Sequence, residues 1–115
     1  GNGDLRELQE WVDVAKKNTE FFSNERAEDL LASIDLYFTE KQYKFEVSDK
    51  KYKVKFQVLY EDKPSVEGVI RVLKVNDGQN CVEVSKAAGE SLQFLSEYKE
   101  FEKSLAGISD AKANC

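Results

Sequence analysis

The sequence predicts an α+β domain: a four-stranded antiparallel sheet with two helices packed on one face, plus a short N-terminal helix. Two observations lead to this fold class. Apolar residues recur at helical intervals before residue 41 and after residue 91, and between these segments the apolar period changes to two. The chain has 115 residues, which is the size of one domain with one core.

The first forty residues are predicted to form two helices. Residues 4–17 place their apolar side chains on one helical face, and residues 1–20 are assigned to this lead-in segment. In the second helix, Ser23 or Asn24 can accept the N–H groups of the first turn, and the helix runs to about Glu40. Its apolar positions are Ala27, Leu30, Leu31, Ile34 and Phe38.

Four strands are expected to follow as a meander. The first spans residues 43–47, and Ser48-Asp49-Lys50 then supplies a turn. The second strand alternates most strictly. Its apolar side is Tyr52, Val54, Phe56, Val58 and Tyr60, and its polar side is Lys51, Lys53, Lys55 and Gln57. This alternation predicts a sheet that packs one face on a core and leaves the other face in water.

The third and fourth strands are predicted over residues 66–75 and 81–86. Asn76-Asp77-Gly78-Gln79 between them is a strong hairpin signal, because Asp-Gly tolerates positive φ. Gly68 interrupts the third strand, which indicates a bulge or a close approach of another part of the chain.

The last helix is predicted to follow Gly89. Its buried stripe is expected to be Leu92, Leu95, Tyr98, Phe101 and Leu105, with Phe94 beside it. Gly107 can end this helix. Residues 109–115 are small and polar, and they are predicted to form a flexible tail.

The composition argues against catalysis. The chain has no histidine, and so it lacks the usual general base near neutral pH and the commonest metal ligand. Cys81 has no histidine partner and is expected to be a small buried apolar residue. The sequence contains no phosphate-binding glycine loop. We therefore expect no catalytic residue, no metal ligand and no cofactor.

The charge and the cysteine content limit the kinds of partner and the cellular compartment that we expect. With 22 acidic and 17 basic residues, a net charge of −5 opposes binding to nucleic acid. Cys81 and Cys115 give no disulfide framework, which favours a reduced compartment. No signal peptide or membrane-spanning stretch is recognised. A cytoplasmic or nuclear location is expected, with peripheral membrane association as a further option.

Basic residues are concentrated between positions 41 and 55, a segment with six lysines and only two acidic residues, Glu46 and Asp49. The lysines are Lys41, Lys44, Lys50, Lys51, Lys53 and Lys55. Such a patch could guide an anionic partner, and each lysine near an anionic membrane contributes about 1 kcal/mol. Alternate lysines also keep a sheet face soluble and its edge from aggregating, and this simpler interpretation is favoured.

Three stretches resemble a known domain family. Residues 21–31 (FFSNERAEDLL), 52–56 (YKVKF) and 82–94 (VEVSKAAGESLQF) are similar to the kinase-associated-1 (KA1) domain. This domain is the C-terminal module of several Ser/Thr protein kinases, among them checkpoint kinases and plant calcineurin-B-like-interacting kinases. The most specific matches lie in the last stretch: Lys86, Gly89, Leu92 and Phe94. Glu90 and Gln93 depart from the family's usual Asp and Glu, which leaves the subfamily open.

The resemblance covers about residues 21–108 and implies a small antiparallel sheet with two helices on one face. Family members restrain their own kinase domain, dock regulatory proteins or bind acidic phospholipids. By resemblance, the chain is a non-catalytic regulatory part of a Ser/Thr kinase whose partner is its own kinase domain or a regulatory protein. Two alternatives stay open: an anionic-lipid binder that uses the six lysines, and a small dimeric scaffold that pairs through the helix at 4–17.

Overall fold

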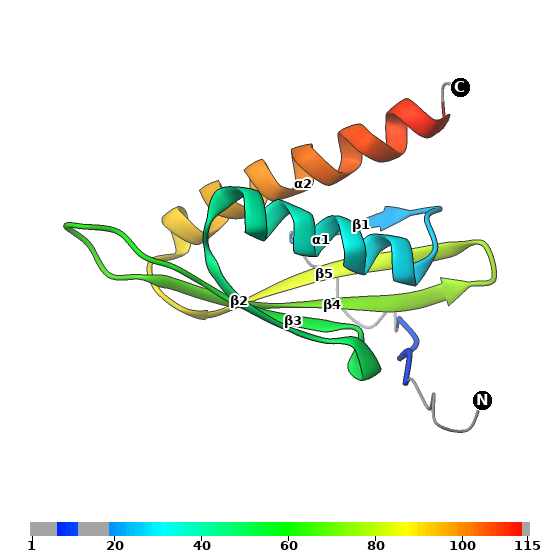
Figure 1. Cartoon of the computed structure of the whole chain (residues 1–115), viewed down its shortest axis with the longest axis horizontal. Coiled ribbons are helices and arrows are strands. Elements are labelled where there is room, and N and C mark those ends of the chain that lie inside the picture. Colours follow the sequence, from blue (N-terminus) through cyan, green and yellow to red (C-terminus); the bar gives the residue numbers. More distant parts are fainter. Residues whose placement is uncertain (1–6, 12–18, 114–115) are drawn as a thin grey trace.

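The computed structural model describes residues 7–11 and 19–113, and it has an α+β fold with two helices on one face of a five-stranded antiparallel sheet (Figure 1). The elements in chain order are β1 (Glu20–Ser23), α1 (Ala27–Lys41), β2 (Lys44–Ser48), the short 3-10 helix η1 (Asp49–Lys51), β3 (Lys53–Val58), β4 (Val66–Asn76), β5 (Gln79–Ala88) and α2 (Ser91–Ala113). The predicted fold class and the placement of the two main helices are therefore confirmed.

The sheet has the order β1-β5-β4-β3-β2, so the predicted four-stranded meander is present and a fifth strand extends it. The predicted number of four strands is wrong because β1 pairs antiparallel with β5, where Phe22 lies opposite Cys81. Phe21 packs against the core and its ring lies 6.1 Å from that of Phe101, whereas Phe22 is exposed. A four-residue strand contains too few alternations for its period to be recognised in the sequence.

The segment at residues 7–11 is extended, and the helix predicted over 4–17 is wrong for these residues. The Lys74 N–H donates to the carbonyl of Gln9, and the Trp11 N–H donates to the carbonyl of Lys74, both at 2.7 Å. The backbone groups of residues 7–11 therefore bond to the part of the β4 edge that β3 leaves unpaired. In a helix these groups would have bonded to one another. The rest of the predicted helix lies outside the described residues.

Helix α1 starts later than predicted. Its first residue is Ala27 and its N-cap is Arg26, so neither Ser23 nor Asn24 caps it. The Ser23 hydroxyl instead accepts the N–H of Glu25 at 3.0 Å, in the turn that joins β1 to the helix. Ser23 belongs to strand β1, which was not predicted, and so it is not available to cap the helix. This explains why α1 begins later than expected.

The core lies between the two helices and the sheet. It contains the inward residues predicted for the second strand, namely Tyr52, Val54, Phe56 and Val58. Phe38 of α1 sits at its centre and stacks on Phe56 at 5.0 Å and on Phe101 at 5.9 Å between ring centroids. Aromatic rings from α1, α2 and β3 therefore fix the helices on the sheet.

The buried stripe of α2 differs from the prediction at its first position. Leu92 is 83% exposed, and the described stripe consists of Phe94, Tyr98, Phe101 and Leu105, with Leu95 partly buried. Spacings of four, three and four residues follow the helical period. Leu92 precedes Phe94 by two residues, or about 200° around the helix, and so it points away from the sheet.

Helix α2 also continues beyond its predicted end. Gly107 lies inside the helix, which extends to Ala113, so residues 109–113 are helical and do not form the predicted tail. A glycine ends a helix most often by taking a positive φ, and among the described glycines only Gly89 has one. Residues 114 and 115 lie outside the described part of the chain.

Phe94→Ala is expected to lower the free energy of unfolding by about 3 kcal/mol, because the ring is buried and leaves a cavity. Leu92→Ala, in the same turn of α2, should change stability by less than about 0.5 kcal/mol, because its side chain is in water. Urea denaturation followed by circular dichroism measures both changes. Equal losses for the two variants would contradict the observed orientation of the helix.

Candidate anion-binding face of the sheet

The sheet face turned away from the helices carries a group of basic side chains. Lys53 and Lys55 alternate along β3 with buried residues and therefore point to this face. Arg71 of β4 lies directly opposite Lys53, so the two side chains share the face. Lys51 precedes β3 and lines one surface pocket together with Lys53, Lys55 and one acidic residue, Glu46. We call Lys51, Lys53, Lys55 and Arg71 the cationic face.

Like charges crowd Lys53. Desolvation is the largest cause that lowers the pKa of Lys53, and the positive charges of Arg71, Lys55 and Lys51 lower it further. Within the described part of the chain, none of these four side chains forms an ion pair. An anion that bound here would relieve this repulsion, because an opposite charge nearby favours the charged form of lysine.

The structure divides the six lysines that the sequence grouped together. Lys44 lines a neighbouring pocket with Lys55, so it lies next to the cationic face. Lys41, at the end of α1, bonds to Glu100 of α2 and therefore belongs to the helical side. Lys50 lies in the exposed turn η1, where its carbonyl accepts the N–H of Glu7. The structure thus groups Lys51, Lys53 and Lys55, with Lys44 beside them, and separates Lys41 from this group.

Arg71 was missed by sequence reasoning, which searched for basic residues close together in the chain. A signal was present: Glu67, Val69 and Arg71 alternate with inward residues along β4 and so predict an outward arginine. Which residue of β3 lies beside Arg71 depends on the register of the two strands. That register brings together residues 53 and 71, which are far apart in sequence.

Acidic charge is concentrated on the opposite side of the sheet. Helices α1 and α2 together contain eight acidic and four basic residues, whereas residues 44–88 contain seven acidic and nine basic residues. Both helices cover one face of the sheet (Figure 1), so their excess of acidic residues lies on the side away from the cationic face. On the outward face itself, Glu46 lies opposite Lys55 and Glu83 lies opposite Arg71.

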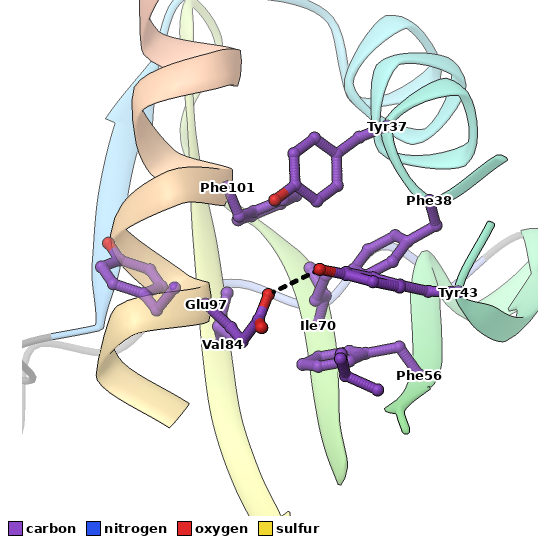
Figure 2. Close-up of a pocket in the computed structure, with 10 residues that line it drawn as sticks. Tyr37, Phe38, Tyr43, Phe56, Ile70, Val84, Glu97 and Phe101 are labelled. Carbon is purple, nitrogen blue, oxygen red and sulfur yellow. Dashed lines mark hydrogen bonds between the residues drawn. The ribbon is translucent and has the colours of Figure 1, made fainter. Parts of the chain in front are cut away.

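Glu97 of α2 is the centre of a second polar cluster, beside the aromatic core. The Tyr43 hydroxyl donates to its Oε1 at 2.9 Å, and the Tyr60 hydroxyl donates to its Oε2 at 2.6 Å (Figure 2 shows the first of these bonds). The adjoining cavity, between Tyr37, Phe101 and neighbouring rings, has a volume of about 10 Å³. That volume holds about one water molecule and leaves no space for a cofactor.

The phenols around Glu97 are held in their neutral form. Burial is the main cause that raises the pKa of Tyr60 to about 12, and the bond to Glu97 adds to it. Burial and Glu97 raise the pKa of Tyr43 in the same way. Both hydroxyls therefore remain hydrogen-bond donors at neutral pH. The cluster connects α2 to the residue just before β2 and to the loop that follows β3, which is a structural role.

The four positions matched to the KA1 family gather around the start of α2. The Lys86 ammonium donates to the Ser91 hydroxyl at 2.9 Å, and Gly89 has a φ of +105° in the turn between β5 and α2. Phe94 is buried and Leu92 is exposed. Three of these residues thus shape the turn and seat the helix.

Metal-binding groups and membrane-spanning helices are absent from the described part of the chain. No group of three or more His, Cys, Asp or Glu residues in this part of the chain could hold a metal ion. None of its helices is long and apolar enough to cross a membrane. Neither protein-family models nor curated proteins gave a match to the chain.

Proposed function

We propose that the chain is a non-catalytic regulatory domain of a Ser/Thr protein kinase that docks onto a protein surface through its cationic face. The partner is the kinase domain of the same chain or a regulatory protein, and docking to the kinase domain restrains it. The observation that carries the docking surface is the juxtaposition of Lys53 and Arg71 on an open sheet face, next to Lys51 and Lys55 and without an ion-pair partner among the described residues. The link to kinases comes from the sequence resemblance.

The charge layout supports an acidic docking surface on the partner. Complementary charges accelerate association and fix the orientation of two proteins. Because the two helices carry eight acidic and only four basic residues, an acidic partner is attracted to the sheet and repelled by the helices. The domain would therefore bind in one orientation, and its affinity would fall as ionic strength rises.

Lys53→Glu combined with Arg71→Glu is expected to weaken binding to the parent kinase domain at least about tenfold, because two cations become anions against an acidic surface. Isothermal titration calorimetry at about 50 mM and about 200 mM salt, within the range where screening changes strongly, measures this effect. Lys99→Glu with Lys103→Glu is the matched control: both lysines are exposed on α2, and the net charge changes equally.

Equal weakening by both double variants would show that only net charge matters and would contradict docking through the sheet. Binding that both variants leave unchanged would place the contact elsewhere. Circular dichroism spectra of the variants establish that each has kept its fold before its affinity is compared.

Binding to anionic phospholipid is the second candidate, and one observation favours it. A basic patch matters for a net acidic domain only if the acidic remainder faces away, and the helical layer does face away from Lys51, Lys53, Lys55 and Arg71. Four such residues near a membrane would contribute about 4 kcal/mol, at about 1 kcal/mol each.

Sedimentation with phosphatidylcholine vesicles, with and without phosphatidylserine, separates the two candidates. Binding only to phosphatidylserine vesicles, lost in the Lys53→Glu, Arg71→Glu variant and kept in the Lys99→Glu, Lys103→Glu control, supports the lipid candidate. Absence of vesicle binding at low salt, where electrostatic attraction is strongest, eliminates it.

A further inference from the structure

Strand β2 forms one edge of the sheet, because the strand order gives it a single neighbouring strand, β3, in the described part of the chain. It pairs with β3 over its whole length, from Lys44 opposite Gln57 to Ser48 opposite Lys53, without a shift in register. It also contains no proline. Bulges and prolines are two devices that stop an edge strand from pairing with another chain. The outer edge of β2 has neither, and so it can accept a further strand.

The register shows which backbone groups of β2 point out of the sheet. The Val72 N–H donates to the carbonyl of Tyr52 at 3.0 Å, so the even-numbered residues of β3 bond to β4. Because the pairs of an antiparallel ladder alternate, the odd-numbered residues of β3 bond to the even-numbered residues of β2. The N–H and C=O groups of Phe45 and Val47 therefore point away from β3, out of the edge.

The two faces of this edge differ in character. The side chains of Phe45 and Val47 are partly buried and pack against the core on the helical side. Lys44 and Glu46 alternate with them, are exposed and point to the face turned away from the helices. The outward side of the edge strand thus carries one positive and one negative charge, two residues apart.

We propose that β2 is a homodimerisation edge, at which two copies of this chain pair their β2 strands antiparallel about a two-fold axis. Charge selects the register. With Phe45 opposite Phe45 of the second copy, Lys44 of each copy lies opposite Glu46 of the other. Moving the axis by one residue, to Lys44 or to Glu46, places two like charges opposite each other. Opposite charges on facing residues stabilise strand pairing, and like charges destabilise it.

This register also suits the neighbours of the paired strands. Glu46 lies between two lysines, Lys55 of its own β3 and Lys44 of the second copy. On the helical side, Phe45 meets Phe45 of the second copy, so the partly exposed end of the core is covered. Both copies use the same edge, so the contact closes after two chains. The dimer places both cationic faces on one side of the joined sheet, and it does not depend on the proposed function.

Charge exchange within β2 tests this register, with the dissociation constant of the dimer measured by analytical ultracentrifugation. Lys44→Glu and Glu46→Lys should each weaken dimerisation at least about tenfold, because each sets like charges opposite one another. The combined variant Lys44→Glu, Glu46→Lys should return the dissociation constant to within about threefold of the unmodified value. The two single variants move the net charge in opposite directions, so an effect of net charge alone would strengthen one dimer and weaken the other.

Hydrogen exchange on the unmodified chain tests whether the contact is made by the edge. At concentrations where the dimer predominates, the amides of Phe45 and Val47 should exchange at least about fivefold more slowly than in dilute solution. The amide of Phe22 is the control, because it points out of the opposite edge of the sheet: the Val84 N–H donates to the carbonyl of Thr19, so every second residue from Thr19 bonds to β5. Its exchange should not change.

Three results would overturn the proposal. A chain that stays monomeric up to about 1 mM would do so and would leave the edge to a strand of another protein. A dimer that neither single variant weakens would contradict the register. A dimer in which the amides of Phe45 and Val47 exchange as fast as in the monomer would place the contact elsewhere. The exchange measurement needs no substitution, so it decides even if a variant fails to fold.

Discussion

Phe38→Ala is expected to lower the free energy of unfolding by about 3–5 kcal/mol, one of the two largest effects that we predict for a single substitution. Phe38 is 2% exposed, and its ring contacts aromatic rings from both helices and from two strands. The contacting rings are those of Tyr37, Tyr43, Phe45, Phe56 and Phe101. Removing the ring leaves a cavity where α1, α2 and the sheet meet, and such close-packed surroundings collapse only in part.

Urea denaturation followed by fluorescence and by circular dichroism measures this loss. Leu36→Ala is the matched control in the same helix: Leu36 is 55% exposed, and its truncation should change stability by less than about 0.5 kcal/mol. A loss below about 1 kcal/mol for Phe38→Ala would mean that the aromatic cluster is loosely packed. The two helices would then need another explanation for their positions.

Gly89→Ala is expected to destabilise the domain by about 3 kcal/mol or more, for two independent reasons. The φ of +105° at Gly89 is a conformation that residues with a Cβ rarely adopt. An added Cβ would also lie 2.6 Å from the carbonyl oxygen of Ser65 and 2.9 Å from the Cα of Val66. Both contacts are with backbone, so β4 or the start of α2 would have to move.

Gly78→Ala is the control for this substitution. The nearest atom to a Cβ at Gly78 is Oδ1 of Asn76 at 3.9 Å, and the turn is held by the bond from the Gly78 N–H to that oxygen. Alanine keeps this N–H, so stability should change by less than about 0.5 kcal/mol. Thermal unfolding of both variants makes the comparison. A mild effect at Gly89 would contradict the tight turn between β5 and α2.

The long elements could be predicted from the sequence because their apolar periods are set by burial on one side. Val54, Phe56 and Val58 alternate in β3 as predicted, and they are buried as predicted. The strand β1 and the extended segment at residues 7–11 could not be predicted in this way. Both are four or five residues long, and their partners, β5 and Lys74, lie about sixty residues away. Local pattern carries no information on such distant pairing.

The candidate site was predictable in part. The alternation along β3 predicts that Lys53 and Lys55 share a face in water, and they do so. Arg71 joins them through the register of β3 with β4, and Lys41 leaves them because α1 ends beside Glu100. Which basic residues share the site therefore depends on contacts between distant parts of the chain. Grouping basic residues by their distance in sequence does not predict these contacts.

The most direct test of docking through the cationic face is a titration of the ¹⁵N-labelled chain with a Ser/Thr kinase domain, the proposed partner, followed by the amide chemical shifts. We expect the largest changes on β3 and β4, centred on Lys53, Lys55 and Arg71, with smaller changes on the helices. Changes confined to α1 and α2, or no changes at concentrations where the kinase domain is restrained, would contradict the account.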